Sequence, residues 1–160
     1  MAKRKIVTIP DPVLRTKAAS VPLTELATPA LRQLVADMVE TMDLADGIGL
    51  AAPQIGLRQR LFIVATKDGA KIFINPKITK HSFLKVTMEE GCLSIPGVFG
   101  TVKRPRRVTV QALDAEGKSF SLEAEGLFAR VIQHEYDHIN GVLFTDKVIR
   151  MTRGEKPAKT

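Results

Sequence analysis

Two stretches of the chain place hydrophobic residues at the spacing of an α-helix. In the first, Thr28 and Pro29 have the cap and first-turn preferences of a helix start. The apolar residues that follow recur three or four positions apart, at Leu31, Leu34, Val35, Met38, Val39 and Met42. Gly47 marks the stop. The pattern predicts an amphipathic helix that buries one face.

The second helical stretch mixes apolar and chemically active side chains. One face of this helix carries Leu127, Val131, His134 and His138. Gly141 follows, a residue of the kind that ends helices. We therefore expect a helix that presents two histidines, one turn apart, on the same side.

Alternating hydrophobic and polar positions predict strands between these helices. The predicted strands are Arg60–Thr66, Lys71–Asn75, Lys85–Glu89, Arg107–Leu113 and Ser119–Glu123. The last two form a hairpin through Asp114–Gly117, whereas Ile95–Pro105 is predicted to be a loop. The fold class we expect is α+β, with antiparallel strands packed around the histidine-bearing helix and the helix that starts at Thr28 outside.

A run of small residues, Gly47–Gly56, suits neither a good helix nor a long strand. Small residues let a backbone approach a ligand or another backbone closely. Gln54 is the one side chain in the run with hydrogen-bonding power. The alternative is a packed turn that crosses the core.

Composition and charge narrow the class of protein. With 160 residues, of which 44% are hydrophobic and 26% charged, the chain predicts one globular domain at residues 1–150. A basic, mobile tail is expected at residues 151–160. No apolar run has the length of a membrane span, and one cysteine excludes an internal disulfide. The net charge of +7 suits an anionic neighbour or simple solubility.

The sequence Gln133–His138 contains H-E-x-x-H, which on a helix offers two imidazoles to one metal ion. Glu135 lies about 100° around the helix from His134, where a general base for an activated water belongs. A catalytic metal usually keeps three protein ligands and one open position. Cys92, the single cysteine, is the best candidate for the third ligand, although a small buried hydrophobe is the common fate of a free cysteine.

Three other interpretations stay open at this point. A zincin-type metallopeptidase needs a third ligand downstream of the motif, and none continues it. A structural Cys-His metal module closes with a fourth protein ligand, for which His81 has no partner cysteine. An RNA-binding domain would explain the basic run at residues 103–107, but aromatic residues for base stacking are scarce.

Three separate segments together resemble the motifs of the peptide deformylase family, G-φ-G-φ-A-A-x-Q, E-G-C-L-S and H-E-x-D-H. They lie, in the family's order, at Gly47–Gln54, Glu90–Ser94 and His134–His138. The similarity extends to Pro10–Arg15 and Gly141–Phe144, and so covers the chain to about Asp146. Two features depart from the family pattern: the C-terminal extension is short, and Arg130 stands where an apolar residue is expected near a substrate pocket.

The resemblance implies a metal-dependent hydrolase that removes the formyl group from the N-terminal formyl-methionine of new polypeptides and releases formate. Cys92, His134 and His138 would hold one divalent ion, with Fe²⁺ as the physiological metal and Zn²⁺, Ni²⁺ or Co²⁺ as substitutes. Glu135 would serve as general acid and base. Donors to the oxyanion would be the Gln54 side chain and the Leu93 backbone N–H.

The resemblance also indicates how a peptide would bind. An extended substrate would lie along the segments of Ile48, Gly49 and Gly91 as an added strand. Its methionine would enter a pocket lined by Ile48, Leu127 and Val131, although Leu127 and Val131 could equally be core residues. The expected partners are formylmethionyl peptides and nascent chains, with weak ribosome association. No membrane or sequence-specific nucleic acid is expected, and the location is the cytoplasm or the bacterial-type compartment of an organelle.

Overall fold

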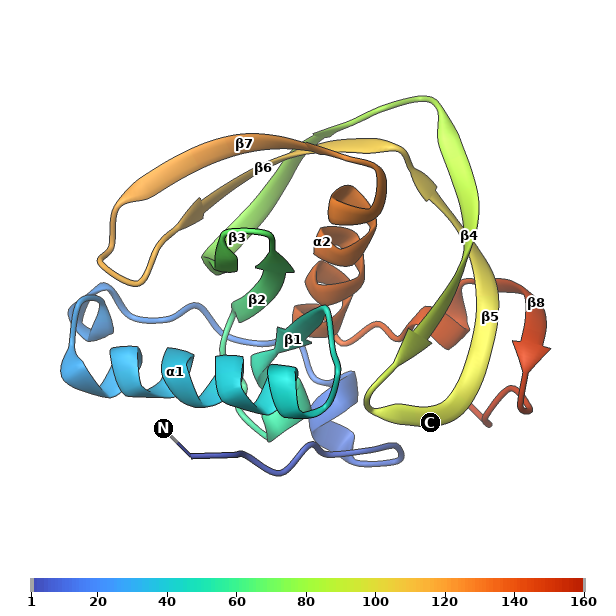
Figure 1. The fold of residues 1–160 in the computed structure, drawn as a ribbon, viewed down its shortest axis with the longest axis horizontal. Coiled ribbons are helices and arrows are strands. Elements are labelled where there is room, and N and C mark those ends of the chain that lie inside the picture. The colour runs from blue at the N-terminus through green and yellow to red at the C-terminus, as the bar shows by residue number, and fades with distance from the viewer. Residues whose placement is uncertain (1, 160) are drawn as a thin grey trace.

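The computed structural model describes residues 2–159, which form two α-helices and eight β-strands (Figure 1). The helices are α1 (Pro29–Leu44) and α2 (Gly126–Ile139). The strands are β1 (Gly49–Ala51), β2 (Leu61–Thr66), β3 (Gly69–His81), β4 (Lys85–Cys92), β5 (Ile95–Pro105), β6 (Arg107–Leu113), β7 (Ser119–Glu125) and β8 (Val148–Arg153). They build a five-stranded sheet in the order β1-β2-β3-β6-β7 and a three-stranded sheet in the order β4-β5-β8. All neighbouring pairs are antiparallel, which confirms the predicted α+β class.

Helix α2 lies between the two sheets, while α1 runs along the outside of the molecule (Figure 1). Toward the five-stranded sheet, Ala129, Ile132 and Ile139 of α2 share a buried cluster with residues such as Phe62 and Phe73. The Phe62 and Phe73 rings stack with centroids 4.8 Å apart. This apolar contact removes one side of α2 from water and anchors the helix on the sheet.

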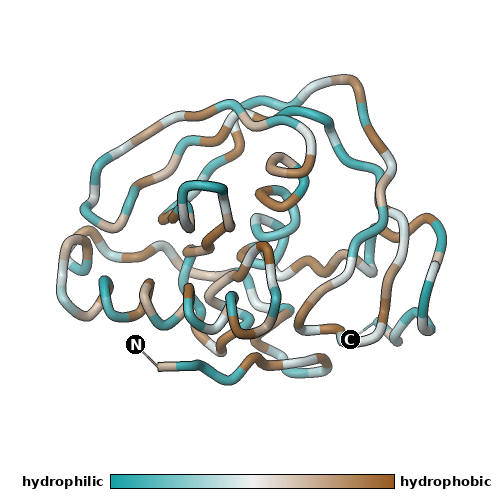
Figure 2. Tube along the Cα trace, in the orientation of Figure 1, coloured by the Kyte–Doolittle hydropathy of each residue, from teal (hydrophilic) through white to brown (hydrophobic). Residues whose placement is uncertain are grey.

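Helix α1 begins as predicted. The Thr28 hydroxyl accepts a hydrogen bond from Leu31 N, and Pro29 occupies the first turn. The helix ends at Leu44, before the expected stop at Gly47. Hydrophobic and hydrophilic residues alternate along both helices (Figure 2), and the apolar side of α1 packs on a second core cluster that includes Leu61 and Ile63 of β2.

The predicted loop at Ile95–Pro105 is wrong, because this segment is strand β5, the middle strand of the three-stranded sheet. Its inward residues alternate as a strand requires, but they are Gly100, Val102 and Arg104. Because a glycine and a buried arginine are not hydrophobic, the sequence of β5 shows no alternation of hydrophobic and polar residues that would predict a strand.

The C-terminal boundary also differs from the prediction. Residues 151–153, for which the sequence predicts a mobile tail, belong to β8, which pairs with β5. The run Gly47–Gly56 divides into the short strand β1 and a 3₁₀ turn, Ala52–Ile55, and is neither a helix nor a long strand, as expected. Within residues 2–159, no helix is long and apolar enough to cross a membrane.

Candidate metal centre and substrate cleft

The three predicted metal ligands come together from two elements. Cys92 is the last residue of β4, and His134 and His138 lie one turn apart on α2. Their candidate ligand atoms all lie within 4.8 Å of one another, and Cys92 Sγ is 3.2 Å from His138 Nε2. Among the described residues, this is the single group of three such side chains at ligand spacing.

The surroundings of the three residues fit a divalent transition metal, for which thiolate and imidazole are suitable ligands. Glu90 Oε1 lies 2.9 Å from His134 Nδ1. An ionised carboxylate can only accept, so Nδ1–H donates and Nε2 is left for a metal. Burial lowers the pKa of His138 well below its usual value, which keeps that imidazole neutral and able to coordinate. Three protein ligands leave room for water or substrate.

Glu135 points into the same site. Its side chain is buried, with 3% exposed, and its Oε2 finds no hydrogen-bond partner in the part of the chain that the structure describes. Burial raises the pKa of Glu135 to about 7. A Cβ atom on Gly49 would lie only 2.5 Å from Glu135 Oε1, so the glycine makes room for the carboxylate.

Gln54 is held in one orientation at the site. Its Oε1 accepts a hydrogen bond from Ala51 N at 2.9 Å, which requires the amide NH₂ to face the other way. That NH₂ lies 3.6 Å from Cys92 Sγ and 3.3 Å from Ser94 Oγ. The N-terminal segment holds the backbone at both Gln54 and Ser94, because Val7 N donates to Gln54 O and Ile9 N donates to Ser94 O. The predicted oxyanion donor is therefore rigidly placed beside the candidate metal ligands.

A cleft of about 510 Å³ opens onto these groups. Its walls include every predicted substrate-contacting residue, namely Ile48, Gly49, Gly91, Leu127 and Val131, together with Leu93. Ile48 and Leu127 are 52% and 56% exposed and flank the opening, whereas Val131 is buried. The strands on either side, β1 and β4, are each the end strand of their sheet. The cleft is thus bordered by two sheet edges.

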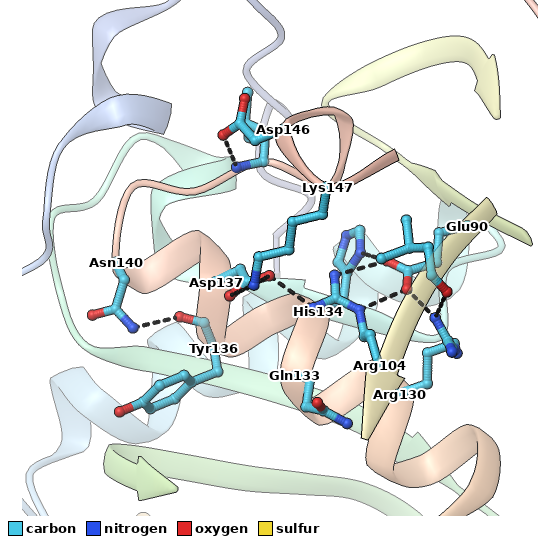
Figure 3. Close-up of polar contacts among 12 residues, drawn as sticks. Glu90, Arg104, Arg130, Gln133, His134, Tyr136, Asp137, Asn140, Asp146 and Lys147 are labelled. Carbon is cyan, nitrogen blue, oxygen red and sulfur yellow. Dashed lines mark hydrogen bonds and ion pairs between the residues drawn. The ribbon is translucent and has the colours of Figure 1, made fainter. Parts of the chain in front are cut away.

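A cluster of buried charges lies behind His134, on the side of the three-stranded sheet (Figure 3). Arg104 donates to both oxygens of Glu90, from Nε at 2.7 Å and from Nη2 at 2.9 Å. Arg104 Nη1 also donates to Asp137 at 2.8 Å, and Lys147 Nζ reaches the same carboxylate at 3.0 Å. Arg130 donates from Nη1 to Glu90 Oε2 at 2.5 Å.

Opposing effects set the ionisation of this cluster. Burial alone would raise the pKa of Glu90, but hydrogen bonds from His134 and Arg104, and the Arg104 charge, hold that pKa well below its usual range. The pKa of Arg104 is raised, because contacts with Glu90 and Asp137 outweigh its burial. Glu90 is therefore a permanent acceptor for His134 Nδ1–H.

The basic run at residues 103–107 does not act as one surface. Arg104 is buried in the cluster, and Arg106 pairs with Glu125 at 3.1 Å. Lys103 and Arg107 are exposed. The sequence did not reveal the ionic role of Arg104 or Arg130, since their shared partner lies 14 and 40 residues away. The one available signal was the unexpected arginine in the helix before H-E-x-x-H.

Comparison with known proteins identifies the family. The family model described as polypeptide deformylase matches residues 3–154. The peptide deformylase of Rhizobium meliloti (strain 1021) is 46% identical over 158 residues, covering 96% of this chain and 89% of that protein. That of Halothermothrix orenii is 50% identical over 145 residues, covering 89% and 92%. The Met-Ala-Ser-bound crystal structure of class I type b peptide deformylase from Acinetobacter baumannii has a TM-score of 0.89 at 34% identity, covering 92% of this chain and 99% of that one.

The fold and the Cys-His-His cluster beside a buried glutamate fit one class of protein, the metal-dependent hydrolases. The chain belongs to the polypeptide deformylase family. It is accordingly a hydrolase that removes the N-formyl group from newly made polypeptides.

Proposed function

We propose that Cys92, His134 and His138 hold one divalent ion in the cleft and that the residues around it carry out deformylation of formyl-methionine. The observation that carries this proposal is the convergence of the three ligand atoms within 4.8 Å beside buried Glu135. When bound, the ion would act as a Lewis acid that lowers the pKa of a water molecule toward neutrality. Helix α2 is then the metal-binding helix around which the strands are arranged.

Glu135 is the proposed general base and acid. It takes a proton from the attacking water and returns one to the departing amine. A pKa of about 7 suits both transfers near neutral pH, because neither protonation state is strongly favoured. Gly49 supports the role by leaving space for the carboxylate against the strand.

Attack on the formyl carbon places a negative charge on the formyl oxygen. The Gln54 NH₂ and the Leu93 backbone N–H are the proposed donors to this oxyanion. The Gln54 amide is held by Ala51 N and Ser94 Oγ, so little reorganisation is needed when the charge develops. One such donor contributes about 3–4 kcal/mol to lowering a barrier.

The peptide would lie extended between the two sheet edges that border the cleft. Its backbone would add to the edges near Ile48 and Gly91, and its methionine side chain would enter the apolar part lined by Leu127 and Val131. The Acinetobacter baumannii relative was crystallised with Met-Ala-Ser, a peptide of the same kind. A formyl group carries only hydrogen on its carbonyl carbon, so a tight site admits it and excludes bulkier acyl groups.

Formate release from a formyl-Met dipeptide, with acetyl-Met as the matched control, tests the proposed reaction. We expect formate from the metal-loaded protein and little turnover of the acetyl peptide. Formate no higher than in the metal-free sample would contradict the proposed metal role. Equal turnover of the acetyl control would indicate a general deacylase.

We further propose Fe²⁺ as the physiological metal. Affinity alone does not favour Fe²⁺, which lies low in the divalent series, but Fe²⁺ accepts five ligands more readily than Zn²⁺. The test is reconstitution with Fe²⁺, Ni²⁺ or Zn²⁺ at matched occupancy, followed by formate release before and after exposure to air. We expect an active ferrous enzyme that decays in air and a stable nickel enzyme. A zinc enzyme equal to the ferrous one would contradict the assignment.

Weak, salt-sensitive ribosome association is the last part of the proposal, along with a cytoplasmic location or the bacterial-type compartment of an organelle. Arg150, Lys156 and Lys159 supply positive charge near the C-terminus. Lys147 is paired with Asp137, and Arg153 lies over the Phe99 ring. Deletion should therefore start at Glu155, which leaves β8 whole. Unchanged co-sedimentation with ribosomes at low salt after this deletion would refute a role for the tail.

A further inference from the structure

The side of α2 that faces the three-stranded sheet is polar along most of its length. This stripe consists of Arg130, Gln133, His134 and Asp137, at three- and four-residue spacing. Each side chain makes a hydrogen bond to β4 or β5, through Glu90, Arg104 or the Pro105 carbonyl. The buried apolar residues of those strands, such as Ile95 and Val102, belong to a separate cluster. The contact between α2 and this sheet therefore depends mainly on polar groups.

This contact runs through the candidate metal centre. Cys92 belongs to β4, whereas both histidines belong to α2, so the ligand set is complete only when the strand and the helix are correctly spaced. Glu90 and Cys92 are two residues apart at the end of β4, and both side chains reach α2: Glu90 Oε1 lies 2.9 Å from His134 Nδ1, and Cys92 Sγ lies 3.2 Å from His138 Nε2. Fixing Glu90 against α2 thus also fixes the approach of Cys92 to the histidines.

Arg130 makes the most extensive connection from α2 to the sheet. Its Nη1 donates to Glu90 Oε2 at 2.5 Å and to Val102 O at 3.0 Å, and its Nη2 donates to Val86 O at 2.6 Å. The side chain is 5% exposed. One guanidinium therefore holds β4 at two points and β5 at a third.

Charge neutralisation does not require this arginine. Arg104 already donates to both oxygens of Glu90, so the carboxylate keeps a charged partner without Arg130. What Arg130 adds is a fixed distance between the sheet and the helix. It also lines the substrate cleft, next to the β4 edge along which the peptide is proposed to lie.

We propose that Arg130 is a positioning residue that sets the separation of β4 from α2, and through it the arrangement of Cys92 against the two histidines and the width of the cleft. This inference rests on the proposed metal role of those three residues. It gives a purpose to an arginine at a position where an apolar residue was expected.

The experiment uses Arg130→Met, which keeps the length of the side chain and removes its three hydrogen bonds. Because Glu90 stays paired with Arg104, no buried charge is left alone and the fold should persist. Arg130→Lys is the conservative variant. Arg106→Met is the matched control, since Arg106 is a half-exposed arginine paired with Glu125. Each protein is loaded with Co²⁺.

Two measurements distinguish positioning from simple packing. The first is the rate at which Co²⁺ is lost to a chelator, together with the visible spectrum of the Co²⁺ site. The second is KM and kcat for formyl-Met-Ala and formyl-Met-Ala-Ser. Arg130→Met should lose metal about 10–100-fold faster, in line with other supporting residues of metal sites. Its spectrum should change, and its KM should rise more for the longer peptide. The rate of metal loss and the KM of Arg130→Lys should lie between those of the wild type and Arg130→Met. Arg106→Met should match the wild type.

Metal loss and spectra equal to the wild type in Arg130→Met would overturn the inference, even if its melting temperature fell. If Arg130→Met does not fold, Arg130→Lys decides, because one ammonium cannot reach all three acceptors. Wild-type metal loss in the lysine variant would then overturn the inference. A wild-type protein that binds no Co²⁺ would instead refute the proposed function, so the two failures are distinguishable.

Discussion

The two buried sides of α2 are held in opposite ways. Toward the five-stranded sheet, Ile132 and its apolar neighbours pack into a hydrophobic cluster. Toward the three-stranded sheet, His134 and Arg130 form hydrogen bonds with Glu90, which also accepts hydrogen bonds from Arg104. Hydrophobic contact is non-directional, whereas an arginine–carboxylate pair with two hydrogen bonds favours one geometry. From this difference we infer that apolar packing holds α2 against the five-stranded sheet. The charged contacts fix the position of α2 relative to the three-stranded sheet, on which the site depends.

The largest expected effect concerns Glu135, which lies between these two sides. Glu135→Gln keeps the shape of the side chain but removes the proton acceptor. Turnover should fall by about 10²–10⁴-fold. The metal content should stay near that of the wild type, because neither histidine is altered. Formate release and metal analysis on the same sample check this, and activity near the wild-type level would point to another base, with Glu90 the first to examine.

In the absence of metal, Glu135→Gln should be more stable than the wild-type protein above neutral pH. The folded pKa of Glu135 is raised from 4.5 to about 7, so the folded state binds this proton more tightly than the unfolded state does. That stabilisation is fully present below about 4.5 and is lost as the pH rises through 7. Relative to wild type, Glu135→Gln should gain on the order of 3 kcal/mol at pH 8. Urea unfolding at pH 4.5 and pH 8 measures the difference, and a pH-independent difference would contradict the raised pKa.

Disrupting the charged contacts between α2 and the three-stranded sheet should also lower the stability of the protein by a large amount. Arg104→Met removes three hydrogen bonds from Glu90 and Asp137, which keep Arg130 and Lys147 as their remaining charged partners, and about 3 kcal/mol of unfolding free energy should be lost. Arg104→Lys should also be clearly destabilised, because one ammonium cannot reproduce the paired hydrogen bonds. Both are measured by urea unfolding. A loss below about 1 kcal/mol in the methionine variant would show that the charged side tolerates change as the apolar side does.

Gln54 approaches the site from the other sheet, just after β1. Gln54→Leu should lower turnover by about 10²–10³-fold, the usual loss for one oxyanion donor. Binding of a product peptide should weaken far less, since the hydrogen bond strengthens only as the oxyanion forms. Turnover and product affinity are compared in the same preparation. Equal losses in both would reduce Gln54 to a binding or packing residue.

The smallest effect is expected on the apolar side. Ile132 is fully buried in the cluster against the five-stranded sheet, and Ile132→Val removes one methylene group. The unfolding free energy should fall by about 0.5–1.5 kcal/mol. The rate of metal loss to a chelator should not change, because the charged side still sets the spacing of the ligands. Faster metal loss would show that both sides position the site.

The parts of the fold with plain periodic patterns could be predicted. The α1 start at Thr28 and the β6–β7 hairpin stand close to where they were expected, because caps, turns and alternation are local signals. The convergence of Cys92 with the two histidines could also be anticipated, since helical spacing brings the histidines together and the chain offers one thiol.

The rest depended on contacts between distant residues. The alternation in β5 is hidden by Gly100 and Arg104, whose burial makes sense only once Glu90 and α2 are in place. The same holds for Arg130, whose three acceptors lie 28 to 44 residues away in the chain. A hydrophobic pattern cannot reveal an interface built from charges.

Cys92 has a practical consequence as the only thiol of the chain. It lines the cleft and is partly accessible to solvent, so a thiol-specific reagent can reach it. A sulfur that holds an ion reacts slowly, whereas a free thiolate reacts readily. If Cys92 holds the ion as proposed, the fraction of protein labelled by a chromogenic disulfide counts the empty sites directly, because no second cysteine contributes background. The single thiol would then report the metal loading of the protein stoichiometrically.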